Sequence, residues 1–366
     1  MDFANLFLRK LRPYKLASHK IWDISPAQRE DILKLDWNEA TIPPSPFVRQ
    51  RIMDLLSEPD FFHLYPSTKN KRLLSLLSEY TNLREENVQY FASSDSLHEY
   101  ICKVFISPDD PVIILGPSYD NFRLTCQANG ANIHFSNVKE DFSFDQKRFE
   151  KDIAAIKPKL VYICNPNNPT GLLHHVSYIK YLVETFTDIL FLIDEAYYEF
   201  AGETCKDLVQ DYGNILISRT FSKAFALANF RIGYLLAAED NIQAINRIRN
   251  PKNVSTIAQE AAIAALLDTE YMYDYVAEVK EGMNYFITES EKKKYHFSII
   301  PSSGNFNLLK FNTYEEKIRL LSFLAENNIF VRDTMQDSIL FNCFRITCGT
   351  KSQMNRVLSV IDHLYR

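Results

Sequence analysis

The chain has 366 residues and a formal net charge of −5, with 46% hydrophobic and 24% charged residues. This length suits two domains or one large domain with a subdomain, and the slight acidity without a basic run argues against nucleic acid as a partner. No apolar run is long enough to cross a bilayer, and the first twelve residues lack the pattern of a signal peptide. The six cysteines show no CxxC pair or metal-like spacing, which is typical of reduced thiols in a cytoplasmic protein without a metal centre.

The amino-terminal region, residues 1–46, is predicted to be an arm that leads into a short extended segment. Residues 33–37 are strand-like, and Asn38 follows them shortly before the turn Pro43-Pro44-Ser45-Pro46, which sets up a helix. From its context Asn38 is either a turn former or a polar group directed at a ligand. Tyr14, within the arm, is either a packed aromatic or a ligand contact.

An aromatic loop, residues 61–68, precedes a predicted helix over residues 71–80. Within the loop, Tyr65 stands directly before Pro66. Aromatic loops that contain proline are most often structural, so these residues alone assign no function to Tyr65.

The next predicted unit is a strand over residues 88–92, the segment Ser93-Ser94-Asp95-Ser96 and a helix that continues to Phe105. Small hydroxyl residues at a helix start leave backbone N–H groups exposed, and the helix dipole favours an anion there. The segment therefore indicates either an anion site or a plain N-cap by Ser93 or Ser94. A further strand, residues 112–115, leads to Tyr119, whose ring at a strand end can lie flat against another planar ring.

Two later strand ends carry polar residues. The segment Asn165-Pro166-Asn167-Asn168-Pro169-Thr170-Gly171 follows the apolar run 160–164, and Asp194-Glu195-Ala196-Tyr197 follows the run 189–193. A carboxylate that is buried at such a position needs a cationic partner. A turn without chemistry uses the same residue types as the first segment, but rarely the full string.

A lysine stands in the mixed run from Ser218 to Arg231, directly after the strand-like residues 215–217. A lysine that is buried has a depressed pKa and can act as an amine nucleophile or a base, whereas a single lysine is most often a surface residue. Thr220 and Ser222 flank Lys223, and Arg231 follows it. A guanidinium is planar, permanently charged and bidentate, which suits a phosphate.

From Glu239 onward the pattern becomes mainly helical and then mixed. Helices are predicted over residues 242–249, 258–268, 269–294, 313–327 and 351–364, and strands over residues 297–300, 306–311, 329–331 and 344–347. Arg332 ends one of these strands and Arg345 lies in another, where the residues alone allow two ordinary edge-strand cations. No GxGxxG follows any strand, which argues against an NAD-binding dehydrogenase.

The order of asparagine, aspartate and lysine, each at a strand end, resembles the fold-type I pyridoxal-phosphate aminotransferases (class I/II). Within that superfamily, the run from Arg219 to Ala228 and the segment Leu11-Arg12-Pro13-Tyr14 look most like histidinol-phosphate aminotransferases. The resemblance covers nearly the whole chain, from about residue 11 to residue 362.

The resemblance implies an α/β fold with a mostly parallel sheet, helices on both faces of that sheet, and a small α+β domain. Residues 1–46 are expected to form the arm and part of the small domain. Residues 47–250 are expected to form the large cofactor-binding domain, and residues 251–366 the connecting helix and the rest of the small domain.

It also implies a role for each polar residue at the strand ends. Lys223 is expected to hold pyridoxal phosphate as a Schiff base and to move protons as base and acid in turn. Asp194 is expected to pair with the ring nitrogen, Tyr197 and Asn168 to hydrogen-bond the phenolate oxygen, and Tyr119 to stack on the ring. The phosphate contacts are expected from Ser93, Ser94, Asp95, Thr220, Ser222 and Arg231, and from Tyr65 of the second subunit of a homodimer.

For the substrate, Arg345 is expected to bind an α-carboxylate, Arg332 with Tyr14 a phosphate, and Asn38 to approach from the arm. The implied function is transfer of an amino group between a small phosphorylated amine or amino acid and a 2-oxo acid such as 2-oxoglutarate. A pyridoxal-phosphate decarboxylase of a serine- or threonine-phosphate type and a non-catalytic binding protein of the same fold remain alternatives.

The chain departs from the family pattern at three positions. Ser93 stands where glycine is usual, and Ser96 where glutamate or a small residue is usual, so the backbone approach to the phosphate is open. Asn229 replaces a glycine two residues before Arg231, and asparagine tolerates a left-handed backbone.

Overall fold

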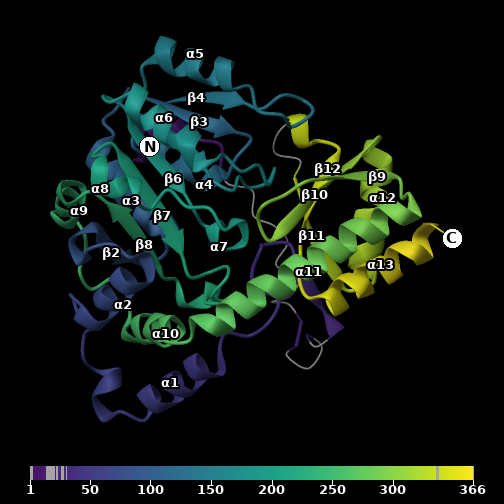
Figure 1. Ribbon diagram of the computed structural model, residues 1–366, viewed down its shortest axis with the longest axis horizontal. Helices are drawn as coiled ribbons and strands as arrows, with labels where there is room; N and C mark the ends of the chain where they lie inside the picture. The colour runs from purple at the N-terminus through teal and green to yellow at the C-terminus, as the bar shows by residue number, and fades with distance from the viewer. Residues whose placement is uncertain are drawn as a thin grey trace.

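The computed structural model of the protein describes residues 3–13, 21, 24–25, 29, 31–334 and 338–365. Figure 1 shows two sheets in this part of the chain, each with helices packed on it. The larger sheet has seven strands, in the spatial order β2, β8, β7, β6, β5, β3, β4. These strands are β2 (Val88–Phe91), β3 (Pro111–Gly116), β4 (Asn132–Asn137), β5 (Leu160–Cys164), β6 (Leu190–Asp194), β7 (Ile215–Thr220) and β8 (Gly233–Ala237).

Every neighbouring pair in the larger sheet is parallel except the two pairs that involve β8. The prediction of a mostly parallel sheet is confirmed. The carboxyl ends of β5, β6 and β7 therefore meet at one edge, which is where ligands bind in open α/β sheets.

Both faces of the larger sheet are buried, because successive residues of a strand point to opposite sides. Val112 and Ile114 pack in an apolar cluster that includes helices α3 (Ser94–Phe105), α4 (Asp120–Ala128) and α9 (Glu239–Asn246). Ile113 and Leu115 pack in the other cluster, which includes α5 (Gln146–Ile156) and α6 (Val176–Thr185). The prediction of helices on both faces is also confirmed.

The smaller sheet has the order β1, β11, β12, β10, β9. Its strands are β1 (Leu33–Leu35), β9 (Phe297–Ile300), β10 (Phe306–Phe311), β11 (Ile329–Asp333) and β12 (Cys343–Thr347). The β1 strand is the only one from the first half of the chain among the described residues of this sheet, and it pairs in parallel with β11. Helices α11 (Thr269–Lys293), α12 (Tyr314–Glu326) and α13 (Lys351–Tyr365) accompany this sheet (Figure 1).

Three further helices pack together: α10 (Thr256–Leu266) lies against both α1 (Pro46–Leu56) and α2 (Lys71–Thr81). The remaining elements are η1 (Leu6–Lys10), η4 (Pro59–Phe62), η5 (Glu85–Asn87), α7 (Tyr198–Ala201), α8 (Leu208–Asp211), η6 (Ala228–Phe230) and η7 (Ser338–Leu340). Helix α10 falls in the predicted segment 251–366 but packs against α1 and α2, which fall mainly in the predicted large domain. The limits of the predicted domains therefore stay a prediction.

The predicted elements differ from the observed ones mainly in extent. The β7 strand continues to Thr220 rather than ending at Ile217, and the sequence pattern does not predict α5, α6 and β8.

No helix of the described residues is both long and apolar enough to cross a membrane. Over the same residues, no group of His, Cys, Asp and Glu side chains is arranged to hold a metal ion. The six cysteines are free and buried.

Two glycines allow the close approaches that shape the strand-end region. A Cβ on Gly233 would lie 2.6 Å from the carbonyl oxygen of Arg219 and 2.8 Å from the amide nitrogen of Ser94, so glycine lets β8 approach the start of α3. Gly171 has a φ of +73°, and a Cβ there would lie 2.5 Å from the Cα of Ser302. The backbone N–H of Ser303 donates to the Gly171 carbonyl at 2.9 Å, which ties the loop after β5 to the segment before β10.

Candidate active site

Lys223 lies just past the carboxyl end of β7, and its side chain is partly buried. Its ammonium donates to the backbone carbonyl of Trp37 at 2.9 Å. Burial, and next the positive charge of Arg345, lower the pKa of Lys223 from 10.5 to about 8. An amine with that pKa exists partly in the neutral, nucleophilic form near physiological pH.

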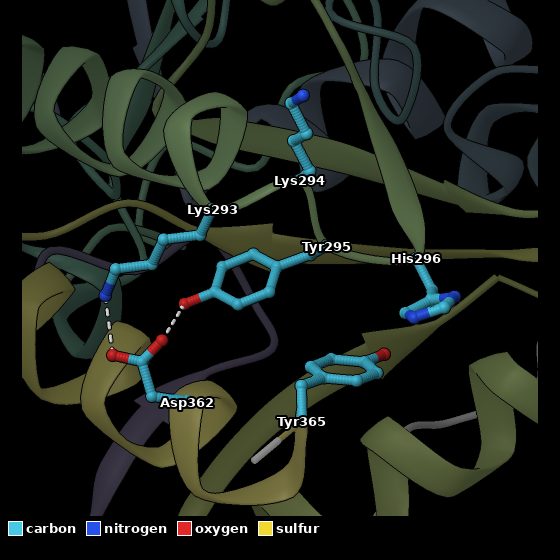
Figure 2. A pocket seen from close by; sticks show the side chains of 6 residues that line it. All are labelled: Lys293, Lys294, Tyr295, His296, Asp362 and Tyr365. Carbon is cyan, nitrogen blue, oxygen red and sulfur yellow. Dashed lines mark hydrogen bonds and ion pairs between the residues drawn. The ribbon is translucent and has the colours of Figure 1, made fainter.

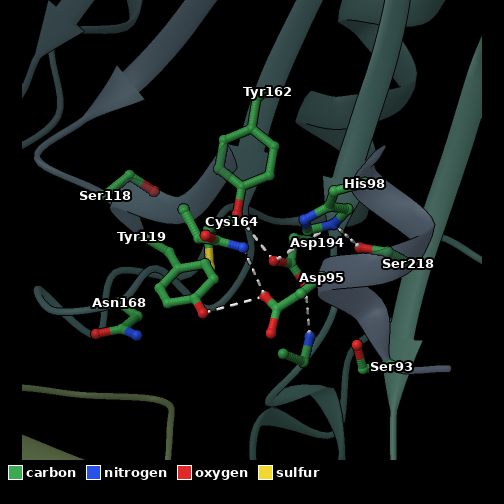
Figure 3. A network of polar contacts seen from close by, with 12 residues as sticks. Ser93, Asp95, His98, Ser118, Tyr119, Tyr162, Cys164, Asn168, Asp194 and Ser218 are labelled. Atoms are coloured by element: carbon green, nitrogen blue, oxygen red, sulfur yellow. Dashed lines mark hydrogen bonds and ion pairs between the residues drawn. The ribbon is translucent and has the colours of Figure 1, made fainter. Parts of the chain in front are cut away.

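Asp194 ends β6 and is 3% exposed. Figure 3 shows its carboxylate among side chains from neighbouring elements. The hydroxyl of Tyr162 donates to Oδ2 at 2.8 Å, and the backbone N–H of Ala196 donates to Oδ1 at 3.2 Å. A carboxylate has about four acceptor positions, so Asp194 can still accept a further N–H.

Tyr197 joins parts of the chain that are far apart in sequence. Its hydroxyl oxygen accepts from Nδ2 of Asn168 at 3.2 Å and from Nδ2 of Asn38 at 3.1 Å. Burial raises the pKa of Tyr197, while the charge of Arg345 lowers it. The ammonium of Lys223 is 5.8 Å from the centroid of the tyrosine ring. These contacts bring Lys223, the amide of Asn168 after β5 and Asn38 to one place.

Arg345 reaches this place from the smaller sheet. It is 8% exposed, and its guanidinium donates to Oδ1 of Asn168 at 2.5 Å and to the carbonyl of Asp36 at 2.6 Å. Arg332 is its partner in the register of β11 and β12. The two arginines thus lie next to each other on one strand pair.

Three other side chains form an anion cradle at the start of α3. Thr220 donates to Oγ of Ser222 at 3.0 Å, and the guanidinium of Arg231 lies 3.5 Å from the same oxygen. Arg231 also pairs with Oδ2 of Asp95 at 3.2 Å. The cradle therefore combines two hydroxyls, a guanidinium and the N-terminus of a twelve-residue helix.

The carboxylate of Asp95 has several partners beside this cradle. Its Oδ1 accepts from the hydroxyl of Tyr119 and from Nδ2 of Asn121, each at 3.1 Å. Together with the pair to Arg231, these contacts tie the first turn of α3 to the start of α4. The ring of Tyr119 is thereby held at the end of the segment after β3 (Figure 3).

The departures at Ser93 and Asn229 have different outcomes. Ser93 has a φ of +93°, a conformation that glycine adopts more readily, and its Oγ caps α3 by accepting the N–H of Ser96 at 3.2 Å. Asn229, in contrast, lies within η6 and has no positive φ. Left-handed conformations in this segment fall instead on Ala226 and Arg231, with φ values of +57° and +52°. The tolerance of asparagine for a left-handed backbone is therefore not used at Asn229.

Among the described residues, Tyr65 is not joined to these clusters. It is 79% exposed, and the ammonium of Lys252 lies 4.4 Å from its ring centroid. Tyr14 lies outside the described residues. The sequence reasoning also missed several groups around the site. These groups are the carbonyl of Trp37, the hydroxyl of Tyr162 and the imidazole of His98. Each belongs to a stretch of sequence that is typical of an ordinary buried core, and no local motif marks them as functional.

The residues present fit pyridoxal phosphate in their chemistry. The anion cradle suits a phosphate, the Asp194 carboxylate suits a protonated ring nitrogen, and the amide and phenol of Asn168 and Tyr197 suit a phenolate oxygen. The buried amine of Lys223 suits an aldehyde. Each of these groups sits at a strand end or a helix start on the same edge of the larger sheet.

Comparisons with known proteins agree with this chemistry. The sequence model described as "Aminotransferase class I and II" matches residues 30–361. A dihydroxyacetone phosphate transaminase of Campylobacter jejuni is 42% identical, over 98% of this chain and 96% of that protein. A histidinol-phosphate aminotransferase of Ruminiclostridium cellulolyticum is 33% identical, over 91% of this chain and 92% of that protein. Among solved structures, histidinol-phosphate aminotransferase from Sinorhizobium meliloti in complex with pyridoxal 5'-phosphate has a TM-score of 0.86 at 22% identity, covering 100% of this chain and 98% of that one.

Proposed function

The chain belongs to the class I and II aminotransferase family, and from this premise we propose that it transfers an amino group between a small phosphorylated compound and a 2-oxo acid such as 2-oxoglutarate. It is a pyridoxal-phosphate enzyme. The relatives support the phosphorylated substrate through their names, which specify dihydroxyacetone phosphate and histidinol phosphate. Both of those molecules carry a phosphate, and neither carries an α-carboxylate.

The observation that carries the proposal is the chain of contacts from Lys223 to Arg345. Tyr197 lies against the lysine and is hydrogen-bonded to Asn168, which in turn accepts from the arginine. A reacting carbon beside Lys223 is therefore within reach of a cation that can bind an acidic substituent. This arrangement supports chemistry on a small, negatively charged substrate.

The roles of the protein's own groups follow from this geometry. A bound cofactor would supply an electron sink for negative charge at the substrate carbon. Lys223 would hold the cofactor through its amine, and once the substrate amine has taken its place it would hold or release the proton of the substrate carbon. Asp194 would hold the ring nitrogen, and Asn168 with Tyr197 would hold the phenolate oxygen. Tyr119 would cover the ring, and Thr220, Ser222 and Arg231 would anchor the phosphate.

A single site must accept two different substrates in turn. In one half-reaction Arg345 binds the α-carboxylate of the amino-acid donor. In the other, the phosphorylated ketone has no carboxylate, so its phosphate takes the place beside Arg345 and Arg332. An arginine serves both purposes because its planar fork matches carboxylate and phosphate oxygens alike.

We extend the proposal to a homodimer in which Tyr65 contacts the cofactor phosphate of the other subunit. The exposed apolar side chains on α1, η4 and the following loop support it, since a patch of this kind marks an interaction surface. They are Phe47, Met53, Leu56, Phe62, Leu64 and Tyr65 itself, with exposed fractions between 46% and 79%. A second copy of the chain would cover them.

A product assay tests the proposal. The cofactor-loaded protein is incubated with glutamate and dihydroxyacetone phosphate, with histidinol phosphate and 2-oxoglutarate, and with phosphoserine or phosphothreonine alone. Amino transfer is followed by mass spectrometry and carbon dioxide by trapping. We expect amino transfer that requires both partners, and slower transfer with unphosphorylated dihydroxyacetone or histidinol. Release of carbon dioxide from a phosphorylated amino acid without a 2-oxo acid would instead support the decarboxylase. That alternative rests on likeness to a threonine-phosphate decarboxylase of Porphyromonas gingivalis, which at 20% identity shows the fold alone.

Borohydride reduction tests the lysine separately. Treatment of the cofactor-loaded protein should fix the cofactor irreversibly on Lys223, as peptide mapping can establish. A label on a different lysine would refute the assignment. A purified protein that binds no cofactor would favour the non-catalytic alternative.

A further inference from the structure

Three buried side chains lie behind Asp194, on elements that do not follow one another in sequence. Tyr162 lies on β5, Ser218 on β7 and His98 on α3, and each is 0% exposed. Figure 3 shows them converging on the same carboxylate. Polar groups are buried at a cost unless they are hydrogen-bonded, so their presence together calls for a physical reason.

Tyr162 is a direct donor to the carboxylate. Its hydroxyl lies 2.8 Å from Oδ2 of Asp194. Burial, and next the charge of Asp194, raise the pKa of Tyr162 well above its ordinary value, so the phenol keeps its proton and can only donate to the carboxylate. With Oδ1 held by the Ala196 N–H at 3.2 Å, both oxygens are engaged and the carboxylate is fixed in rotation.

His98 is oriented by its neighbours so that one nitrogen faces the carboxylate. Its Nε2 lies 3.0 Å from Oγ of Ser218 and 3.9 Å from Oδ2 of Asp194. Its Nδ1 is buried and has no hydrogen-bond partner among the described residues, and the ring packs edge-on against Phe122 and Tyr162. A buried N–H without an acceptor costs more than a bare nitrogen lone pair beside aromatic rings. Nε2 therefore carries a proton, and its N–H is directed toward Ser218 and Asp194.

We propose that Tyr162 and His98 are positioning residues that keep the shared proton on the cofactor's ring nitrogen rather than on Asp194. This inference rests on the proposed pairing of Asp194 with that nitrogen. The carboxylate and the ring nitrogen compete for one proton. Donors directed at the carboxylate stabilise its charged form, which leaves the proton on the ring. The Nε2–H of His98, held by Ser218 at 3.0 Å, adds a dipole whose positive end lies 3.9 Å from Oδ2 of Asp194.

Two other titratable groups near the Asp194 carboxylate carry no charge that would shift the shared proton. Burial raises the pKa of the Cys164 thiol on β5 well above its ordinary value, and burial also raises the pKa of Tyr197 after β6. Both remain protonated and neutral at physiological pH. Within the described residues around Asp194, the proton balance is therefore set by the carboxylate, its two donors and the ring.

Four substitutions separate this role from a structural one. Tyr162→Phe removes only the hydroxyl and keeps the ring that stacks on Phe122 at 4.3 Å between centroids. His98→Gln places an amide N–H three bonds from Cβ, where Nε2 stands, whereas His98→Asn places it where Nδ1 stands. Asp194→Asn serves as the reference in which the ring nitrogen has no anionic partner.

Tyr295→Phe is the matched control. The Tyr295 hydroxyl also donates to an aspartate, Oδ1 of Asp362, at 2.5 Å. It borders an open cavity of about 210 Å³ that is further lined by Lys293, Lys294, His296 and Tyr365, between the end of α11 and α13 (Figure 2). The same chemical group is thus removed from a tyrosine–aspartate pair that takes no part in the site.

The measurement is the ¹⁵N chemical shift of the ring nitrogen in holoenzyme loaded with ¹⁵N-labelled pyridoxal phosphate, at a fixed pH at which Asp194 and the ring nitrogen together hold one proton. This shift reports which of the two groups carries that proton. We expect the parental shift in His98→Gln and Tyr295→Phe. In Tyr162→Phe and His98→Asn the shift should move toward that of an unprotonated ring nitrogen, since one hydrogen bond to a charged group changes a proton equilibrium by about tenfold or more.

The outcomes discriminate cleanly. A parental shift in Tyr162→Phe overturns the proposal, and a parental shift in His98→Asn removes His98 from it. A shift that moves toward the unprotonated value in Tyr295→Phe would show a general effect of the lost hydroxyl and would also overturn it. A parental shift in Asp194→Asn would refute the pairing of Asp194 with the ring nitrogen, which is a failure of the proposed function rather than of the donors behind it.

Discussion

Arg332 and Arg345 face each other directly across the antiparallel strands β11 and β12. Residues opposite each other in such a ladder project to the same side of the sheet, with their Cβ atoms about 4.5–5.5 Å apart. Because Arg345 contacts Asn168, the shared side is the one that faces the site. Two arginines on that side support the proposed binding of a substrate phosphate.

Arg332→Ala should therefore weaken a phosphorylated substrate selectively. The loss of a hydrogen bond to a charged group amounts to about 1.5–3 kcal/mol, or about 10- to 150-fold in kcat/KM. The unphosphorylated analogue should be nearly unaffected, because it never uses the contact. Arg319→Ala, on the exposed face of α12, is the control. An equal loss on both substrates would contradict the phosphate assignment.

Asp194→Asn should leave the fold intact and slow the reaction strongly. Loss of one partner of a buried charge pair costs about 3–4 kcal/mol, which is on the order of 10²–10³ in rate. Steady-state kinetics with saturating cofactor provide the measurement, and circular dichroism checks the fold. Activity within a few-fold of the parent would mean that another residue pairs with the ring nitrogen.

Lys223 should make the stability of the cofactor-free protein depend on pH. Its pKa is about 8 in the folded chain against an ordinary 10.5. Between these two values the unfolded chain binds the proton that the folded chain has released, so the free energy of unfolding rises with pH through this window. Below pH 8 the buried charge costs about 3 kcal/mol.

Lys223→Met should remove this dependence. The variant is expected to be more stable than the parent by about 2–3 kcal/mol at pH 7, with the difference gone near pH 10.5. Urea unfolding at several pH values measures it. Lys147→Met, at an exposed position on α5, should show no such difference. A parent and a Lys223→Met variant that respond identically to pH would show that the lysine is not desolvated.

Tyr65 provides a test of the homodimer by complementation. Tyr65→Ala and Lys223→Ala should each be nearly inactive alone. In a mixed dimer, the subunit that keeps Lys223 receives Tyr65 from its neighbour, so one of the two sites is complete and activity returns. Mixing the variants after mild denaturation and refolding, with size-exclusion chromatography to confirm a dimer, gives the readout. If Tyr65 serves its own subunit, mixing restores nothing.

Arg219 should be essential to the fold rather than to the chemistry. It is 1% exposed and pairs with Oε2 of Glu195 at 2.8 Å, and its guanidinium lies 3.7 Å from the ring centroid of Tyr198. Arg219→Met leaves the glutamate buried without its cation, which should lower the free energy of unfolding by about 3–5 kcal/mol. Urea denaturation measures this. A loss below about 1 kcal/mol would show that the pair is solvent-screened.

The sequence predicted the strand-end part of the site well because parallel strands bring their carboxyl ends together. Asn168, Asp194 and Lys223 each follow an apolar run, so their proximity followed from the fold class. These features depend on local pattern and on one topological rule.

The contacts behind the site could not be predicted in the same way. Tyr162 occupies an alternating position in a strand that is buried on both faces, where a tyrosine reads as one more large apolar residue. His98 lies on the buried side of an amphipathic helix, and only the packing of α3 against β7 brings its Nε2 to Ser218. Likewise, the contact of Lys223 with the Trp37 carbonyl joins positions that no periodicity connects.

The pairing of β1 with β11 has a consequence for how the enzyme matures during synthesis. Leu33 pairs with Ile329, and the N–H of Asn38, just beyond that strand, donates to Oγ1 of Thr347 at 3.0 Å. A ribosome makes the first partner of each contact early and the second only near the end of translation. The larger sheet can assemble while the chain is still growing, but the arm has no strand to join until the last of the small sheet emerges. Lys223 is therefore synthesised long before the strands that complete the substrate site, and any truncation that removes β11 or β12 should abolish turnover because β1 loses its place in the small sheet.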